Sequence, residues 1–165
     1  MKIITPSDFF QIFKDKHILL DTSVFIDSFL HPAEFGEFFN SLRAQGATLV
    51  SMDSVKIEFL KGALNDEKYK QKAEFFDQII ETSLPVINDT LLKLYELIQK
   101  YREEGKSLSV TDLFLGATLM QYKGSLFLLT KNTTDFPTNI FNLKSYINIS
   151  YTKGLHVYGV YSIYD

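Results

Sequence analysis

Four acidic residues, far apart in the sequence, offer the clearest signal of chemistry in this chain. They are Asp21, Glu58, Asp112 and Asp135. Each lies close to a point where a strand is expected to end or a helix to begin. No serine or cysteine has an evident histidine partner, and there is no glycine-rich phosphate loop, so carboxylate oxygen is the chemistry that remains.

Each of these acids also has a purely structural interpretation. Asp21 stands between a predicted strand and a predicted helix, where it could serve only as the helix N-cap. Asp112 could be the third residue of a capping box, Asp135 a turn residue that bonds its own backbone, and Glu58 a solvated helix residue. Asp27 lies six residues along the helix from Asp21, and we predict that it is a surface residue outside the site.

The composition predicts one domain with an ordinary core. The chain has 165 residues, of which 45% are hydrophobic, and a chain of this length can bury a core without cross-links. Cysteine is absent, so a metal ion would need oxygen ligands or histidine, and His17, His31 and His156 show no shared ligand spacing. The formal net charge of -3 argues against a surface built for non-specific nucleic-acid binding, although it leaves room for a local basic patch.

The hydropathy of the chain predicts a soluble, cytoplasmic protein. No apolar run approaches the roughly 20 residues that a membrane-spanning helix needs. The first residues also lack the long apolar segment of a signal peptide.

Short apolar runs that alternate with helical periodicity predict the fold class. The predicted strands are residues 18–20, 48–50, 84–87 and 125–129. The predicted helices are residues 7–14, 22–30, 33–45, 54–61, a longer helix opened by 65–67, a helix capped at Asn88, and 113–122. This alternation predicts a three-layer α/β/α fold whose central, mostly parallel sheet is covered on both faces. Because the carboxyl ends of parallel strands meet at one edge of such a sheet, the four acids could lie together.

The end of the chain predicts an additional hairpin. Residues 146–151 and 155–164 alternate between apolar and polar around a glycine, as hairpin strands do. Tyr158, Tyr161 and Tyr164 are three residues apart, so in a strand they would not share one face, which argues against a single stacking platform for RNA. We expect an added edge strand here, which could serve a subunit contact.

Four segments that contain the acids resemble the motifs of a known family, in order and in spacing. They are residues 20–27, 54–62, 109–118 and 129–136. Together they resemble the PIN-domain family and, within it, the toxin nucleases of VapC type. The resemblance implies a single PIN-like domain with a core at about 17–150. Residues 1–16 would then add an N-terminal helix, and residues 151–165 a C-terminal extension that is a strand or hairpin.

The resemblance implies an endoribonuclease that depends on Mg²⁺ or Mn²⁺ and hydrolyses RNA phosphodiester bonds. The four acids, Asp21, Glu58, Asp112 and Asp135, would be catalytic and would hold the metal. The matching polar positions, which would bond to the carboxylates and the metal-bound water, are Ser23, Thr130 and Asn132. Three cations lie beside the motifs, where they could contact substrate phosphates or be solvated surface lysines: Lys56, Lys61 and Lys131.

Electrostatics explains why such a cluster would need a cation. Two ionised carboxylates ~5 Å apart repel each other by ~3 kcal/mol at an effective dielectric constant of about 20. Four of them together would require a cation or protonation. Hard carboxylate oxygens suit Mg²⁺ or Mn²⁺, which would activate a water and neutralise charge on the scissile phosphate.

The resemblance also implies partners, and it leaves competing functions open. The implied partners are an RNA substrate, an inhibitory protein antitoxin and a second copy of the chain in a homodimer. One competing function is that of a catalytically silent PIN-like module that binds RNA or protein without cleaving it. Another is that of a haloacid-dehalogenase-like phosphatase, but that family expects a second aspartate two residues after the first, where this chain has Ser23.

Overall fold

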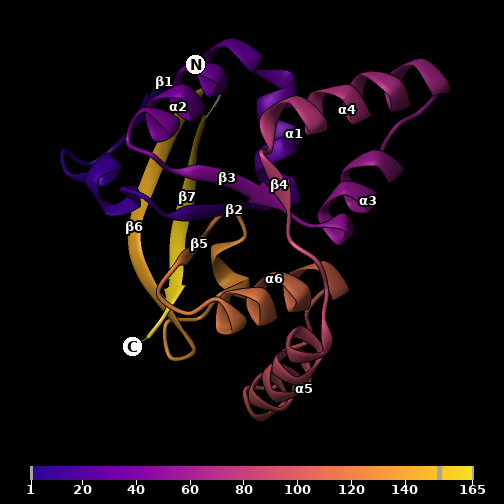
Figure 1. The fold of residues 1–165 in the computed structure, drawn as a ribbon, viewed down its shortest axis with the longest axis vertical. Helices are drawn as coiled ribbons and strands as arrows, with labels where there is room; N and C mark the ends of the chain where they lie inside the picture. Colours follow the sequence, from indigo (N-terminus) through magenta and orange to yellow (C-terminus); the bar gives the residue numbers. More distant parts are fainter. Residues whose placement is uncertain (1, 152–153, 165) are drawn as a thin grey trace.

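The computed structural model of the protein describes residues 2–151 and 154–164. Within these ranges one sheet has the strand order β1-β6-β7-β5-β2-β3-β4 (Figure 1). Its strands are β1 (Lys2–Ile4), β2 (His17–Leu20), β3 (Thr48–Ser51), β4 (Thr82–Ser83), β5 (Leu126–Thr130), β6 (Phe141–Tyr151) and β7 (Gly154–Ile163). The α-helices are α1 (Thr22–Leu30), α2 (Pro32–Ala44), α3 (Asp53–Lys61), α4 (Asp66–Ile79), α5 (Asn88–Glu103) and α6 (Val110–Gln121). Two short 3-10 helices are η1 (Phe9–Phe13) and η2 (Thr133–Asp135).

The predicted α/β fold class is confirmed, and the parallel strands form one half of the sheet. Strand β2 pairs in parallel with both β5 and β3, and β3 pairs in parallel with β4. Every residue of β5 is buried, as are the last three of β2, which is why both strands appear as continuous apolar runs. In Figure 1, α1, α2 and α4 lie above β2 and β3, whereas α5 and α6 lie below them.

The other half of the sheet is antiparallel and contains the predicted hairpin. Strands β6 and β7 pair along their length, β7 also pairs with β5, and β1 pairs with β6 at the outer edge. The prediction of an edge strand at the C-terminus was therefore wrong, because β7 lies between β5 and β6. Its residues 158–162 are all buried, as expected for an interior strand. The residues that join the two strands, 152–153, lie outside the described ranges.

Three local predictions also need correction. The predicted strand at 84–87 is instead β4 at Thr82–Ser83, since Pro85 has no amide hydrogen to pair with β3. The helix predicted at 7–14 is the shorter 3-10 helix η1. Strand β1 was not predicted, because three residues at an edge are too short to show an alternating pattern.

A single hydrophobic core joins the helices to the sheet. Phe25 of α1 stacks on Phe76 of α4 at 4.4 Å between ring centroids, and Phe59 of α3 lies beside Phe25. These contacts hold α1 and α3 together at the edge where β2 and β3 end. Among the helices of the described ranges, none is both long and apolar enough to cross a membrane.

Close packing of α6 gives a test of the fold. Gly116 faces Leu97 of α5 and Phe141 of β6, and a Cβ added at Gly116 would lie 2.6 Å from Leu97 Cδ2 and 3.0 Å from Phe141 Cζ. Gly116→Val should therefore lower the free energy of unfolding by about 1–3 kcal/mol, measured by urea denaturation. Gly36→Ala in α2 is the matched control, because its Cβ meets nothing within 4 Å and alanine favours the helix by ~1 kcal/mol. Equal effects of the two substitutions would contradict this packing.

Candidate active site

Asp21 caps α1 and also faces a cluster of hydroxyl groups. Its backbone N–H donates to the carbonyl of Leu129 at 3.2 Å, which extends the β2–β5 pairing by one residue. Its Oδ1 accepts from the Thr22 N–H at 2.6 Å, as an N-cap does. Its Oδ2 accepts from Ser23 Oγ and from Thr130 Oγ1, both at 2.7 Å. The side chain is therefore a helix cap and, through its second oxygen, part of a wider polar arrangement.

Glu58 reaches the same place from α3. Its Oε2 accepts a hydrogen bond from Thr22 Oγ1 at 2.7 Å, so the residue after Asp21 links the two acids. Thr22 was missed in the sequence analysis, because threonine beside a helix cap is common and carries no charge. Its place directly after Asp21 was the one signal that could have identified it.

Asp112 enters the site from α6 and is also part of a capping arrangement. Ser109 is the N-cap, and its Oγ accepts from the Asp112 N–H at 3.1 Å. The same Oγ donates to Asp112 Oδ2 at 2.5 Å, which fixes the carboxylate. Only 6% of Asp112 is exposed, so its structural role in the cap coexists with burial among other acids.

These three carboxylates share one cavity of about 270 Å³. The cavity is lined by Asp21, Thr22, Ser23, Ile26, Glu58, Asp112, Lys131 and Asn132. It lies where β2 and β5 end and where α1, α3 and α6 come close to one another. The structure thus brings together three of the four predicted acids, from segments more than 30 residues apart.

Asp135, the fourth predicted acid, does not line the cavity. It ends η2, and its backbone carbonyl accepts a hydrogen bond from Tyr101 Oη. Its charge still acts on Asp112, whose pKa it helps to raise. Asn132 lines the cavity, and its backbone N–H donates to Thr130 Oγ1 at 2.9 Å, which orients the hydroxyl that reaches Asp21.

Burial and the charges of nearby acids raise the pKa of Asp21 and of Asp112. Burial raises the pKa of Asp21, against the hydrogen bonds from Ser23 and Thr130, and the charge of Glu58 adds to the increase. Burial also raises the pKa of Asp112 to about 6, and the charges of Asp21, Asp135 and Glu58 contribute. The cavity therefore holds more negative charge than its surroundings compensate.

Comparison with known proteins places this site in a family. A family model described as PIN domain matches residues 18–136, a segment that contains all four acids. The chain belongs to the PIN domain family. PIN domains are generally nucleases.

One solved structure supports the same fold for this PIN domain. It is the crystal structure of VapBC2 from Rickettsia felis bound to a DNA fragment from their promoter, which is similar with a TM-score of 0.59 and 18% sequence identity. The similarity covers 72% of this chain and 89% of that chain. At this identity the likeness is one of fold. A comparison with curated proteins gives no significant match.

The donor chemistry of the PIN-domain cavity fits a divalent cation, although the side chains are not arranged as a complete metal site. Among the described residues, no group of three or more histidine or acidic side chains is close enough together to hold an ion. The donors are nonetheless hard carboxylate oxygens, which Mg²⁺ and Mn²⁺ prefer. In the described structure no hydrogen bond reaches Asp112 Oδ1 or Glu58 Oε1, so both remain free to act as ligands. A cation would also relieve the repulsion that raises the pKa of Asp112.

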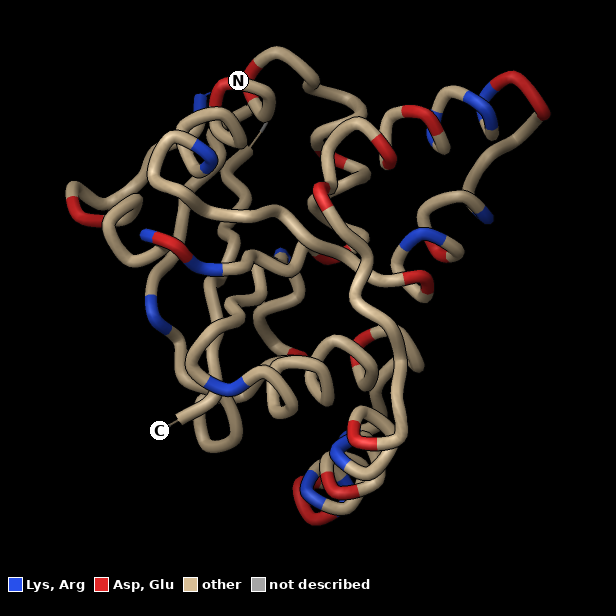
Figure 2. Tube along the Cα trace, viewed as in Figure 1, with Lys and Arg blue, Asp and Glu red and all other residues tan. Residues whose placement is uncertain are grey.

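Of the three predicted phosphate-binding lysines, one lines the cavity. Lys131 does so, and its Nζ lies 3.0 Å from Asp27 Oδ2. Lys56 instead pairs with Asp77 at 2.6 Å, and Lys61 lines a separate, larger hollow between α3 and α4. The other cations are scattered over the chain (Figure 2). A phosphate contact therefore has geometric support at Lys131 and none at Lys56 or Lys61.

The prediction that Asp27 is a surface residue was wrong. Only 7% of it is exposed, because the C-terminal hairpin covers this part of α1. Its Oδ2 accepts hydrogen bonds from Tyr158 Oη and from Lys131 Nζ. Burial acts to raise the pKa of Asp27, but the hydrogen bonds and the charge of Lys131 hold it below its usual value. The hairpin that buries Asp27 is distant in sequence, so helix periodicity could not reveal it.

The raised pKa of Asp112 predicts how stability depends on pH in metal-free protein. The folded state keeps the Asp112 proton up to about pH 6, whereas the unfolded chain loses it near the ordinary value of about 4. The free energy of unfolding should therefore decrease as the pH rises from 4 through 6. Asp112→Asn should flatten this decrease and raise the free energy of unfolding at pH 7 by about 1–2 kcal/mol, since solvent screens part of the effect.

Urea denaturation between pH 4 and 7, with chelator present, measures this pH dependence. Glu103→Gln, at the exposed end of α5, is the control and should keep the wild-type curve. A wild-type profile that Asp112→Asn leaves unchanged would contradict the assigned electrostatics.

Proposed function

We propose that this protein is an endoribonuclease that depends on Mg²⁺ or Mn²⁺ and hydrolyses RNA phosphodiester bonds. The observation that carries the proposal is the shared cavity of Asp21, Glu58 and Asp112, within a family whose members are generally nucleases. Asp21 and Asp112 are buried beside Glu58, and their burial as acids destabilises the metal-free protein. Such an arrangement is expected in a site that binds a cation and a phosphate.

Each residue of the cavity has a definite part in this proposal. Asp21, Glu58 and Asp112 hold the cation, and Asp135 adds negative charge that acts on Asp112. The bound cation would supply an activated water and would offset charge on the scissile phosphate. Lys131 contacts a phosphate oxygen from the rim of the cavity.

Hydroxyl groups keep the carboxylates in position. Ser23 and Thr130 hold Asp21, Thr22 holds Glu58, and Ser109 holds Asp112. These donors stabilise the ionised form of each acid and restrict its rotation, which is the usual task of groups that support metal ligands. Asn132 supports Thr130 through its backbone N–H and also lines the cavity.

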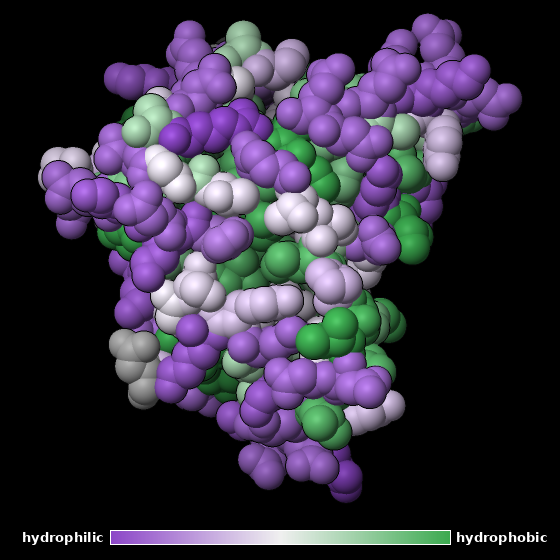
Figure 3. All heavy atoms as spheres, in the orientation of Figure 1, coloured by the Kyte–Doolittle hydropathy of each residue, from purple (hydrophilic) through white to green (hydrophobic). Residues whose placement is uncertain are grey.

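We further propose that the protein is the toxin of a toxin–antitoxin pair, active in the cytoplasm. The similarity of its fold to a chain of the VapBC2 complex supports this role, with a protein antitoxin as inhibitor. A homodimer is part of the same proposal. Exposed apolar side chains on and before α5 offer a surface for such a contact, and green residues gather beside α5 in Figure 3. The exposed apolar side chains in this region include Val86, Ile87, Leu92 and Tyr95.

A silent binding module is the second candidate function. The incomplete metal geometry of the cavity favours this module, because a PIN fold that no longer binds metal could still hold RNA. The arrangement of Asp21 and Asp112, each held by hydroxyl donors, favours the nuclease over the binding module. Cleavage separates the two functions, since only the enzyme requires both acids.

Cleavage of structured RNA by the purified protein tests the proposed activity. With Mg²⁺ or Mn²⁺ present the wild type should cut RNA, and Asp112→Asn should lower the rate on the order of 10²-fold or more, because it removes a ligand charge at the reacting phosphate. Glu103→Gln, an acid outside the cavity, should cleave at the wild-type rate. Equal activity in wild type and Asp112→Asn would refute the assigned site, and no activity with either metal would favour the binding module.

Calorimetric titration with Mn²⁺ tests the cation site without relying on cleavage. The wild type should bind Mn²⁺, and Asp21→Asn should weaken binding clearly because one negative ligand is lost. Thr130→Val keeps the shape of the side chain but removes the hydroxyl that orients Asp21, so the affinity should fall about 10–100-fold. Thr138→Val, a change outside the cavity, should leave the isotherm unaltered. An unaltered isotherm for Asp21→Asn would count against the site.

A further inference from the structure

A second polar cluster lies beside the acidic cavity, and of its residues only Lys131 has a part in the proposed reaction. At its centre is Asp27, whose Oδ2 accepts from Lys131 Nζ at 3.0 Å, from Tyr151 Oη at 3.3 Å and from Tyr158 Oη. His156 Nδ1 lies 3.7 Å from the same oxygen. The cluster thus joins α1 to the hairpin of β6 and β7. Lys131 belongs both to it and to the cavity lining.

Tyr151 and His156 of this cluster form a row of three rings with His31, in which Tyr151 contacts the other two. The ring centroids of His31 and Tyr151 are 5.1 Å apart, and those of Tyr151 and His156 are 4.6 Å apart. The His156 side chain is 44% exposed, and His31 and Tyr151 are each half-buried. Tyr158, in contrast, is fully buried, so it anchors the hairpin and offers no face to a ligand.

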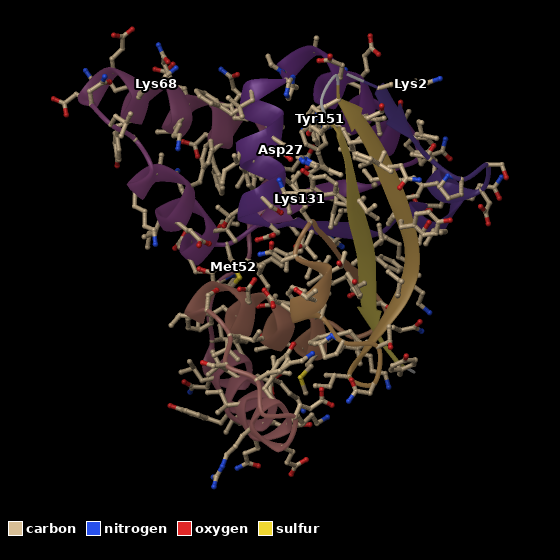
Figure 4. The ribbon with its side chains drawn as sticks, turned by 180° about the vertical axis from the view of Figure 1, so that it is seen from behind. Lys2, Asp27, Met52, Lys68, Lys131 and Tyr151 are labelled. Carbon is tan, nitrogen blue, oxygen red and sulfur yellow. The ribbon has the colours of Figure 1, made fainter. Side chains whose placement is uncertain are left out.

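Lys131 connects the row of rings to the acidic cavity. Lys131 lines the cavity and touches Asp27, and Asp27 in turn touches Tyr151. In Figure 4 the labelled residues Lys131, Asp27 and Tyr151 follow one another beside the hairpin. A nucleic-acid strand with a phosphate at Lys131 would therefore bring a neighbouring nucleotide to the rings.

We propose that His31, Tyr151 and His156 form a stacking subsite for a base of single-stranded RNA next to the phosphate that Lys131 contacts. The choice of RNA as the ligand of this subsite rests on the proposed function. Aromatic faces bind bases of every kind by stacking, while a nearby cation holds the backbone. Asp27 compensates the charge of Lys131, and the chain as a whole is acidic. Stacking supplies affinity that scattered cations do not.

Two of the three rings of the subsite lie outside the matched family segment. Tyr151 and His156 follow residue 136, where the match to the PIN domain model ends. The competing interpretation is that the cluster only anchors the hairpin to α1. That interpretation accounts for Asp27, Tyr158 and the approach of His156 to Asp27, but it does not require a row of three rings.

Binding of two oligonucleotides by fluorescence anisotropy tests the subsite. The probes are a labelled oligouridine of about eight nucleotides and an abasic oligomer of the same length and charge. The wild type should bind the oligouridine at least about five-fold more tightly than the abasic oligomer. Tyr151→Leu and His156→Leu should each reduce that preference, whereas Tyr151→Phe should keep it because the ring remains. Lys131→Met should weaken both probes alike, since it removes charge and no ring.

Tyr146→Leu is the matched control. Tyr146 is 51% exposed and lies on β6 five residues before Tyr151, so its side chain is on the opposite face of the sheet. This variant should keep the wild-type preference for the oligouridine. Thermal denaturation of each variant verifies that it is folded. If Tyr151→Leu is unfolded, His156→Leu provides the test of the subsite.

The outcomes for the subsite and for the proposed function are separable. A preference that Tyr151→Leu and His156→Leu both leave intact overturns the subsite, as does equal binding of the two probes by the wild type. Failure of the wild type to cleave RNA, with the base preference present and lost in the ring variants, refutes the nuclease and supports the subsite.

Discussion

The parallel pairing of β2 with β5 is the constraint on which the candidate site depends. It sets Leu20 opposite Leu129, so the next residues, Asp21 and Thr130, meet where the two strands end. The apolar residues of both strands enforce this register, because a shift by one residue would turn buried side chains to the opposite face. The most buried part of the fold therefore determines where the carboxylate of Asp21 lies.

Two carboxylates of the cavity combine a structural role in helix capping with a proposed role in cation binding. Asp21 is the N-cap of α1 and Asp112 lies in the first turn of α6, positions where acids stabilise the helix N-terminus. Burial raises the pKa of both, and the charges of nearby acids add to the increase. Structural capping and cation binding are thus compatible, since capping holds each carboxylate in the orientation that a cation would require. Hydrogen bonds from neighbouring hydroxyl groups reduce the free-energy cost of keeping these buried acids ionised.

The sequence was sufficient for those features that local patterns encode. Apolar runs located β2, β3 and β5, and the acids at their ends indicated a shared edge, which three of the four occupy. Features that depend on long-range pairing were out of reach. The insertion of β7 beside β5 could not be inferred, and the hairpin of β6 and β7 covers Asp27 and brings Tyr151 to it. The two-residue strand β4 carried too little pattern to be distinguished from the apolar run at 84–87.

Lys131 links the cavity to the C-terminal hairpin, because it lines the cavity and contacts Asp27 beneath the hairpin. The central claim is that Asp21, Glu58 and Asp112 converge to hold one divalent cation. A crystal structure of the protein soaked in Mn²⁺, with anomalous diffraction at the manganese absorption edge, tests this claim most directly. The account predicts an anomalous peak in direct contact with carboxylate oxygens of at least two of these residues. A cavity without a peak, or a peak held only by other residues, would contradict it.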